Sequence, residues 1–442
     1  MRFREPVYHS GAKAHYTPIR AAMFAAMERQ RCTPVALWQW QLDKLNAVIA
    51  NARTITSYYR HLPAGPLKSL GQIRELPTLT KAELRQHRSE MISHAGARSG
   101  VTKTTGRSTG APVTVLKTRH AISIELAATW RGMSSAGVCA GDEQAPFWGV
   151  PSECAARTKA TPVDVAPKRF RCSAFPFADA DLRQFHRAIF HRQPTYCYGY
   201  VSMLRALCHY IISSDLARPS SLNAVVTSAE PMTQIDRRNL QLRLNTTLLN
   251  KYGCGELGTI AHECEHHSLH ENQDTHLFKI LDDQGTPVRT GKPGHIVITD
   301  LFNYATPLIR YHIADPSSHR TENCPCGRGL PVLDEVAGRE YDILINKSGD
   351  RFHGEFFLYI FEELTRLGLP ISAFRITQTD IDDLTLEIAA DSKSITQQAI
   401  EYILWPLRSS FSNSINLNTT AVKYIPREQS RKLRIVRRLM EP

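Results

Sequence analysis

A loop dense in hydroxyl groups and glycine is the first stretch of the chain whose residues suit a chemical task. It reads Lys103-Thr104-Thr105-Gly106-Arg107-Ser108-Thr109-Gly110-Ala111-Pro112. Glycine lets backbone N–H groups turn inward around an anion, and Ser and Thr hydroxyls add donors, so this loop suits a polyphosphate. No Gly-Lys-Ser/Thr follows at the offset of a Walker loop, which excludes that motif. Composition alone also permits an ordinary solvated loop.

Three cysteines and a histidine have the types and spacing of a metal site. Cys264 and His270 lie close in sequence, and Cys324 and Cys326 flank a proline in a predicted tight turn. Three thiolates and one imidazole satisfy tetrahedral Zn²⁺ with no open position, which is typical of a structural site. Unligated buried thiols are the alternative interpretation. Further histidines nearby could compete as ligands, namely His262, His266 and His267.

Several more motifs follow the hydroxyl-rich loop. They are Ser228-Ala229-Glu230-Pro231, Tyr252-Gly253-Cys254-Gly255-Glu256-Leu257-Gly258, Asn303-Tyr304-Ala305-Thr306-Pro307-Leu308-Ile309-Arg310-Tyr311 leading to Asp315, the cysteine-containing stretch 324–331, and Gly338-Arg339. In this order and at these intervals, the set resembles the motifs of the phenylacetate–CoA ligase family of adenylate-forming enzymes, close to relatives found in polysaccharide gene clusters. The resemblance extends over residues 45–442.

The resemblance implies an ATP site in which the loop grips the phosphates. The loop residues concerned are Thr104, Thr105, Gly106, Arg107, Ser108, Thr109 and Gly110, of which Thr109 is also a catalytic candidate. Glu256, a second catalytic candidate, would hold Mg²⁺ against the phosphates, because a hard cation prefers carboxylate oxygen. Asp315 would accept hydrogen bonds from the ribose hydroxyls, a task that suits a carboxylate.

The same resemblance implies an adenine site and a nucleotide contact near a hinge. Adenine would lie between Tyr252, followed by Gly253, and the backbone of three residues of the earlier motif: Ala229, Glu230 and Pro231. Arg339 would contact the nucleotide where the chain enters its last domain.

Lys432 resembles the family's mobile catalytic lysine. A point ammonium on a rotating domain can bridge the carboxylate and the α-phosphate only when that domain closes. A basic tail is the alternative, since 426–438 is rich in Lys and Arg and such runs are usually solvated or bind anionic surfaces. The chain departs from the family's motifs at Arg107, at Ile313-Ala314, at Glu340-Tyr341-Asp342 and at Arg431.

Hydrophobic periodicity indicates which elements position the motifs. Residues 17–52 predict two amphipathic helices, Thr80 is an expected N-cap for a helix over 80–90, and strand 113–118 places the loop's glycines in a turn, with a hairpin as one reading. Further predicted elements are helix 119–138, strand 146–150, helical patterns within 177–215, strand 223–228, helix 233–244, strand 246–251, antiparallel strands within 277–300, strands 343–346, 373–378 and 384–388, and helices 354–367 and 393–409.

The β–α–β order within 223–251 argues for a parallel sheet with ligand at the carboxyl ends of its strands. Phe147 and Trp148 end an earlier strand, where they could line the acyl-substrate pocket or simply fill the core. The predicted fold class is therefore α/β, and the resemblance specifies the adenylate-forming enzyme fold. A composition change near Arg339 predicts a large ATP- and acid-binding adenylation domain over 1–338, with mostly parallel sheets and a β-rich subdomain, and a small mobile α+β lid domain over 339–442.

The bulk composition is that of a globular protein. The 442 residues are 42% hydrophobic and 22% charged, enough to bury two or three domains. Without a long apolar run or a signal-peptide core, we expect a cytoplasmic protein with no membrane span. The formal charge of +12 suits a protein that attracts ATP and an anionic carboxylate, and equally a nucleic-acid-binding one.

The resemblance favours ATP-dependent activation of a carboxylic acid, with an aromatic acid expected, as an acyl-adenylate that is captured by coenzyme A. The expected cofactors are ATP/AMP, Mg²⁺, CoA and structural Zn²⁺. An amine, a hydroxyl or a carrier-protein thiol could replace CoA as acceptor. A basic zinc-ribbon protein that binds nucleic acid is the alternative of another class; it leaves Glu256 and Asp315 unexplained, so no nucleic-acid partner is expected. The sequence leaves homodimer formation open.

Overall fold

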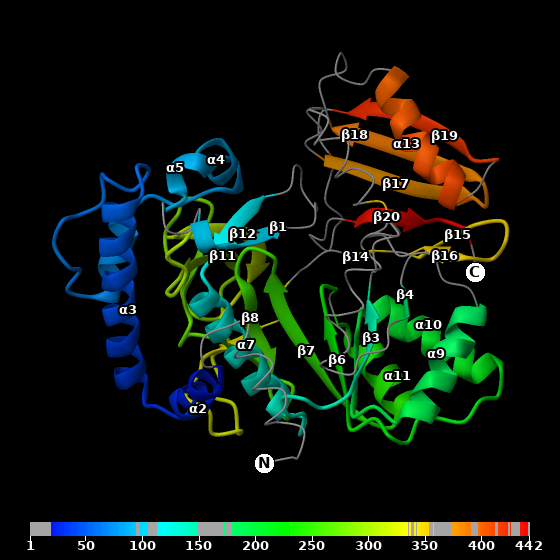
Figure 1. Ribbon diagram of the computed structural model, residues 1–442, viewed down its shortest axis with the longest axis horizontal. Helices are drawn as coiled ribbons and strands as arrows, with labels where there is room; N and C mark the ends of the chain where they lie inside the picture. Colours follow the sequence, from blue (N-terminus) through cyan, green and yellow to red (C-terminus); the bar gives the residue numbers. More distant parts are fainter. Residues whose placement is uncertain are drawn as a thin grey trace. The chain divides into compact units, whose positions relative to one another are not determined.

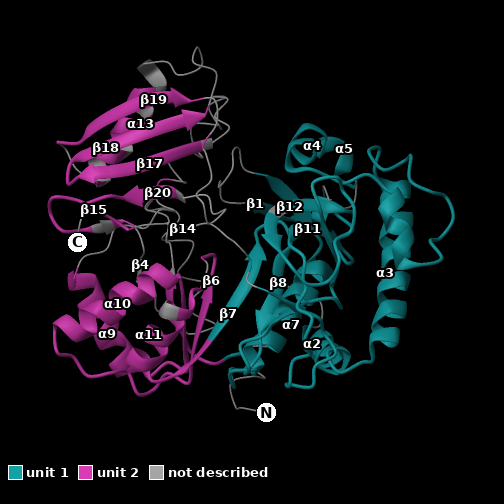
Figure 2. Cartoon of the chain, turned by 180° about the vertical axis from the view of Figure 1, so that it is seen from behind, with its two compact units in different colours: residues 1–105, 113–141, 249–337 teal, residues 106–112, 142–248, 338–442 magenta. Residues whose placement is uncertain are grey.

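The chain forms two compact units in the computed structural model, which Figure 2 distinguishes by colour; Figure 1 labels the helices and strands. Unit 1 comprises residues 1–105, 113–141 and 249–337, and unit 2 comprises residues 106–112, 142–248 and 338–442. The structure describes residues 19–93, 98–104, 113–148, 172–173, 179–230, 232–334, 336, 340–341, 343–352, 357, 373–389, 397–411, 414–422, 425 and 434–440. No helix in these ranges is long and apolar enough to cross a membrane.

Helices at the N-terminus of unit 1 begin where the sequence supplies caps. Thr33 accepts a hydrogen bond from the Ala36 N–H, and Pro34 occupies the first turn. Thr80 and Glu83 form a capping box, as the predicted N-cap requires, but the predicted helix 80–90 is divided at His87. The unit 1 helices are α2 (Ile19–Arg29), α3 (Pro34–Ile55), η1 (Leu70–Glu75), α4 (Lys81–Gln86), α5 (Arg88–Met91) and α7 (Arg119–Ser134).

The two strands that flank the hydroxyl-rich loop form an antiparallel pair. Val101 of β1 (Val101–Thr104) pairs with Lys117 of β2 (Thr114–Lys117), and Thr104 pairs with Thr114. Two consecutive antiparallel strands are what a hairpin requires, which agrees with that reading of the sequence; residues 105–112 themselves lie outside the described residues.

Antiparallel strands make up the remaining sheets of unit 1. The predicted strands within 277–300 are confirmed as β10 (His276–Leu281) and β11 (Gly294–Asp300), with β12 (Tyr311–Ser317) beside β11. A second set contains β7 (Thr247–Cys254), β8 (Gly258–Glu263), β9 (Leu269–Glu271) and β13 (Val332–Leu333). The unit boundary falls inside β7. Phe278, Ile280, Ile296 and Ile298 enter one core with residues of the second set.

Unit 2 contains a set of parallel strands, one of which is the predicted strand 223–228. The order is β6 (Ala224–Ser228), β5 (Tyr196–Gly199), β3 (Gln144–Trp148) and β4 (Cys172–Ser173), and the pairs β3–β4, β3–β5 and β5–β6 are parallel. The helices are α9 (Asp179–Arg192), α10 (Val201–Ser213) and α11 (Gln234–Leu244). Phe147 is fully buried in this core; the Trp148 side chain lies outside the described residues.

The C-terminal part of unit 2 forms a mixed five-stranded sheet built only from residues beyond 339. Its order is β14 (Glu340–Tyr341), β20 (Arg434–Arg438), β17 (Ala373–Asp380), β18 (Asp383–Ala389) and β19 (Asn416–Val422), with helix α13 (Gln397–Ser410) and the short pair β15 (Leu344–Ile345) and β16 (Arg351–Phe352). The predicted helix 354–367 falls almost entirely outside the described residues. A separate lid domain over 339–442 stays a prediction.

Candidate active site

Glu256 lies in the tight turn between β7 and β8. Gly253 and Gly258 make this turn possible, because a Cβ at Gly253 would lie 2.2 Å from the Gly258 carbonyl oxygen and Gly258 has a φ of +80°. The Glu256 side chain is buried and has two partners from elsewhere in unit 1. The Tyr311 hydroxyl donates to Glu256 Oε1 at 2.9 Å, and Lys81 Nζ lies 3.3 Å from the same oxygen.

These partners keep the Glu256 carboxylate charged although it is buried. Burial works to raise its pKa, but the Lys81 ammonium and hydrogen bonds from Cys254 and Tyr311 outweigh it, so the pKa of Glu256 is lowered. The pKa of Tyr311 is raised, by burial first and by Glu256 second, so the phenol remains a hydrogen-bond donor. A buried carboxylate held in its ionised form is the group that a divalent cation requires.

Tyr252 and Asp315 form a second contact of unit 1. The Tyr252 hydroxyl donates to Asp315 Oδ2 at 2.8 Å, and both side chains are only partly buried. Tyr252 comes from β7 and Asp315 from β12, so the two residues predicted to bind adenine and ribose are brought together. One oxygen of the Asp315 carboxylate is left for a further donor.

Strand β12 links the two contacts. Tyr311 begins this strand and holds Glu256, while Asp315 lies four residues further on and holds Tyr252. Four residues of extended chain span about 13 Å. The predicted magnesium ligand and the predicted ribose ligand are therefore arranged along one strand.

Ala229 and Glu230, at the carboxyl end of β6, belong to unit 2. Ala229 has a φ of +69°, a left-handed conformation that a residue other than glycine adopts at a cost of about 1 kcal/mol. The Glu230 carboxylate accepts hydrogen bonds from Ser202 N (2.7 Å) and Ser202 Oγ (2.9 Å) in the first turn of α10. The side chain of Glu230 is thus used within unit 2, and only its backbone remains for a base.

Other predicted ligands are only partly placed. Thr104 ends β1, and Gly253 lies in β7 at the start of the Glu256 turn. The remaining candidates lie outside the described residues: Thr105, Gly106, Arg107, Ser108, Thr109, Gly110, Pro231, Arg339 and Lys432.

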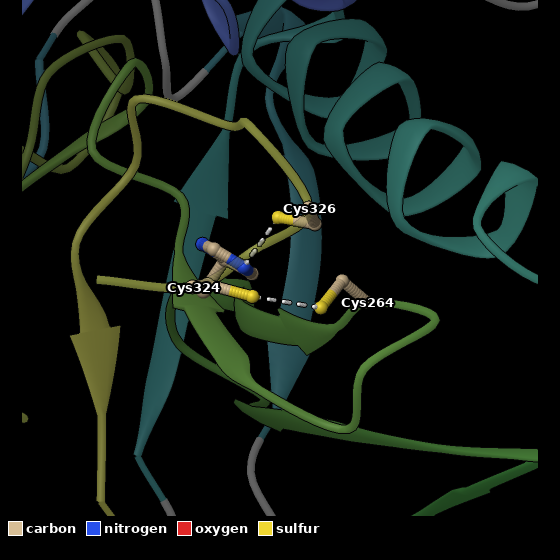
Figure 3. Close-up of side chains that lie close together, drawn as sticks. Cys264, Cys324 and Cys326 are labelled. Atoms are coloured by element: carbon tan, nitrogen blue, oxygen red, sulfur yellow. Dashed lines mark hydrogen bonds between the residues drawn. The ribbon is translucent and has the colours of Figure 1, made fainter. Parts of the chain in front are cut away.

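The predicted zinc ligands come together (Figure 3). The ligand atoms of Cys264, His270, Cys324 and Cys326 all lie within 4.8 Å of one another. Cys264 Sγ is 3.5 Å from Cys324 Sγ, and Cys326 Sγ is 3.2 Å from His270 Nε2. His270 Nδ1 lies 2.8 Å from the Leu330 carbonyl oxygen, which can only accept, so Nδ1 carries the hydrogen and Nε2 is free to bind a metal. The residues fit a tetrahedral Zn²⁺.

Lys81 and Tyr311 were not predicted as partners of Glu256, although Tyr311 belongs to one of the motifs. Lys81 follows the capping residue Thr80 and reads as an ordinary residue of a helical first turn, and Tyr311 reads as a buried strand residue. Lys81 and Glu256 are far apart in the chain, so only their packing reveals the contact. Alternation within β12 could have suggested that Tyr311 and Asp315 act together.

No model of a known protein family matches the chain. A phenylacetate–coenzyme A ligase of Thermus thermophilus is 35% identical over 130 residues, which are 28% of this chain and 29% of that protein. A phenylacetate–coenzyme A ligase of Pseudomonas putida is 22% identical over 446 residues, 93% of each chain. Among solved structures, 2-hydroxyisobutyryl-CoA ligase in complex with 2-HIB-AMP and CoA superposes with a TM-score of 0.66, at 18% identity, over 93% of this chain and 92% of that one.

The shared architecture defines the class: this is the fold of the adenylate-forming CoA ligases. Within that class, several of the curated proteins that the chain resembles are phenylacetate–CoA ligases.

Proposed function

We propose that the protein is an acid–CoA ligase that activates a carboxylic acid with ATP and passes the acyl group to coenzyme A. In the first step a carboxylate oxygen attacks the α-phosphorus of ATP, the bond to pyrophosphate breaks, and an acyl-adenylate forms. In the second step the CoA thiol attacks the acyl carbon, a proton leaves the sulfur, and AMP departs.

The observation that carries the proposal is the pair of contacts along β12. Tyr252 and Asp315 (2.8 Å) and Tyr311 and Glu256 (2.9 Å) set two carboxylates along one strand. Asp315 would accept hydrogen bonds from the ribose hydroxyls. Glu256, with its lowered pKa, would hold Mg²⁺, which neutralises charge on the phosphates when bound. The hydroxyl-rich loop would supply N–H and O–H donors to the same phosphates.

The acid is proposed to be aromatic, on the strength of the relatives' names alone. The structural metal is proposed to be zinc, held by Cys264, His270, Cys324 and Cys326 without an open position. Its task would be to tie β8 and β9 to the stretch 324–330.

Pyrophosphate release tests the first step. Purified protein with ATP and Mg²⁺ should release pyrophosphate only when a substrate acid is added, and aryl acids should outperform short aliphatic acids. Glu256→Gln keeps the shape and the Tyr311 contact but removes the charge, so its rate should fall about 100-fold. Absence of pyrophosphate with a broad panel of acids would overturn the proposal.

The acceptor is tested separately. With the best acid, CoA should be consumed and a thioester formed, as detected by mass spectrometry. If the acyl-adenylate accumulates in the presence of CoA, the first half of the proposal stands and the acceptor is wrong.

A further inference from the structure

Lys117, the last residue of β2, is a buried cation with buried or partly buried anionic partners. Its side chain is 2% exposed, and Nζ lies 3.0 Å from Glu125 Oε2 and 4.0 Å from Asp300 Oδ2. Burial alone would lower the pKa of Lys117, but Glu125 and Asp300 more than compensate, so the pKa is raised and the ammonium stays charged. An ionic group at the base of the loop hairpin is costly to bury unless its partners are fixed.

Glu125, on α7, packs directly on the turn that carries Glu256. The Cβ that Gly258 lacks would lie 2.1 Å from Glu125 Cδ and 2.3 Å from its Oε1. The carboxyl group therefore fills the space of a missing side chain at the end of the β7–β8 turn. Burial would raise the pKa of Glu125, but Lys117, Lys103 and Lys251 lower it, so cations of β1, β2 and β7 surround one carboxylate.

Asp300 connects the same lysine to the motif that starts at Asn303. Asp300 Oδ1 accepts hydrogen bonds from Phe302 N (3.0 Å) and Asn303 N (3.2 Å). Asn303 Nδ2 then donates to the Leu116 carbonyl oxygen at 3.0 Å, and Leu116 N donates to Thr306 Oγ1 at 3.1 Å. Both backbone groups of Leu116 are thus held by this motif, so it anchors strand β2.

We propose that Lys117, Glu125 and Asp300 are positioning residues that fix the base of the hydroxyl-rich loop in register with the turn that carries Glu256. This inference rests on the proposed function, because it assigns the two connected segments to the phosphates and the magnesium ion of one nucleotide. The triad touches neither. It acts by keeping β2, α7 and the β7–β8 turn in one rigid arrangement, and a misplacement of 1 Å in such an arrangement can cost about 100-fold in rate.

Charge removal within the triad provides the test. Glu125→Gln keeps the packing on Gly258 but leaves Lys117 without its nearest anion, and Lys117→Met removes the cation. The double variant removes Lys117 together with the charge of its nearest anion, and it serves if a single variant folds poorly. Lys117→Arg keeps the charge and should restore most of the function lost in Lys117→Met.

A second buried ion pair on the same helix supplies the matched control. Arg131 of α7 lies 2.7 Å from Asp274, and both side chains are almost fully buried. Asp274→Asn should destabilise the fold to a similar degree without touching β2 or the β7–β8 turn.

Two readouts separate positioning from stability. By titration calorimetry with Mg-ATP, Glu125→Gln and Lys117→Met should bind at least about tenfold more weakly, and Asp274→Asn should bind as the wild type does. In a hydrogen-exchange experiment, Glu125→Gln should speed the exchange of backbone amides in both segments, 114–118 and 255–258. Asp274→Asn should speed it in neither segment.

The inference would be overturned if Glu125→Gln bound Mg-ATP as tightly as the wild type does. It would also be overturned if Asp274→Asn lost as much affinity for Mg-ATP as Glu125→Gln does. Exchange that rises in only one of the two segments would also overturn it. If the wild type binds no nucleotide, the proposed function fails, and the exchange experiment still decides whether the triad couples the two segments.

Discussion

Asp315 shows how one side chain can serve both the fold and a ligand. Its Oδ2 accepts the Tyr252 hydroxyl at 2.8 Å, and a carboxylate has further acceptor sites for two ribose hydroxyls. An asparagine has a single acceptor oxygen, so in Asp315→Asn the Tyr252 hydroxyl and the ribose hydroxyls would compete for the same oxygen. We expect this variant to fold normally and to bind ATP about 10- to 100-fold more weakly, since hydrogen bonds to charged groups contribute about 1.5–3 kcal/mol.

The measurement is titration calorimetry with Mg-ATP. Tyr252→Phe, which loses the hydroxyl but keeps the ring, should weaken binding less than Asp315→Asn does. Asp282→Asn is the control, because Asp282 is a carboxylate of the same unit that accepts hydrogen bonds from Gln284 and Thr286 in a turn. Equal affinities of Asp315→Asn and the control would remove Asp315 from the nucleotide site.

At this scale, the sequence predicted identities but not contacts. Tyr252 and Asp315 were each singled out by motif, yet they are 63 residues apart, and their hydrogen bond follows only from how β7 and β12 pack. The Glu230 carboxylate was given no role by the motif, and it holds the first turn of α10 through Ser202, a residue with no distinctive spacing from it.

Among the elements, the cysteine-rich turn has connections beyond the metal ligands. Arg328, two residues after Cys326, donates to Gln30 Oε1, Glu265 Oε2 and Ser135 Oγ at 3.1, 2.8 and 3.0 Å. The Gly329 N–H donates to the Gln30 carbonyl oxygen at 2.8 Å. A metal that fixes 324–326 would thus also fix the connection between α2 and α3.

We therefore predict that zinc removal loosens segment 28–33 as well as the ligands themselves. The protein as purified should contain one zinc per chain, and chelation or Cys326→Ser should speed hydrogen exchange in 28–33 about tenfold, equivalent to about 1.4 kcal/mol of local stability. Cys32→Ser is the control, because this thiol lies in the same segment but outside the quartet. Unaltered exchange in 28–33 after complete zinc loss would contradict the prediction.

Most elements were predictable because their periodicity and caps are local. The predicted strand 113–118 and helices 119–138 and 233–244 are observed as β2, α7 and α11 within a few residues at each end. The division of the helix at His87 was missed. After the division, the carbonyl of Glu90 in the short helix α5 accepts hydrogen bonds from Tyr58 N and Ser57 Oγ, tertiary contacts that no local pattern records.

At the scale of the whole molecule, the two units cannot be read from the sequence, because each is built from segments that are not consecutive in the chain. Unit 1 takes three separate segments, and contacts such as Gln41 Nε2 to the His276 carbonyl oxygen join residues 235 apart. The chain passes into unit 2 between Ala337 and Gly338, one residue from the boundary that composition indicates. The same unit also includes 142–248, so the independence of the C-terminal segment has to be tested by function.

The predicted lysine provides that test. In the sequence, Lys432 comes shortly before β20, a strand that pairs on both sides, with β14 and with β17. If this sheet belongs to a lid that closes for the first half-reaction only, Lys432→Ala should slow pyrophosphate release about 100- to 1000-fold and leave the affinity for ATP unchanged. Thioester formation from a supplied acyl-adenylate should keep its wild-type rate. Arg431→Gln removes one positive charge from the neighbouring position and should have little effect on either step. Equal losses in both variants would mean that the segment acts as a basic tail, and equal losses in both half-reactions of Lys432→Ala would mean that the lysine supports the fold rather than the adenylation step.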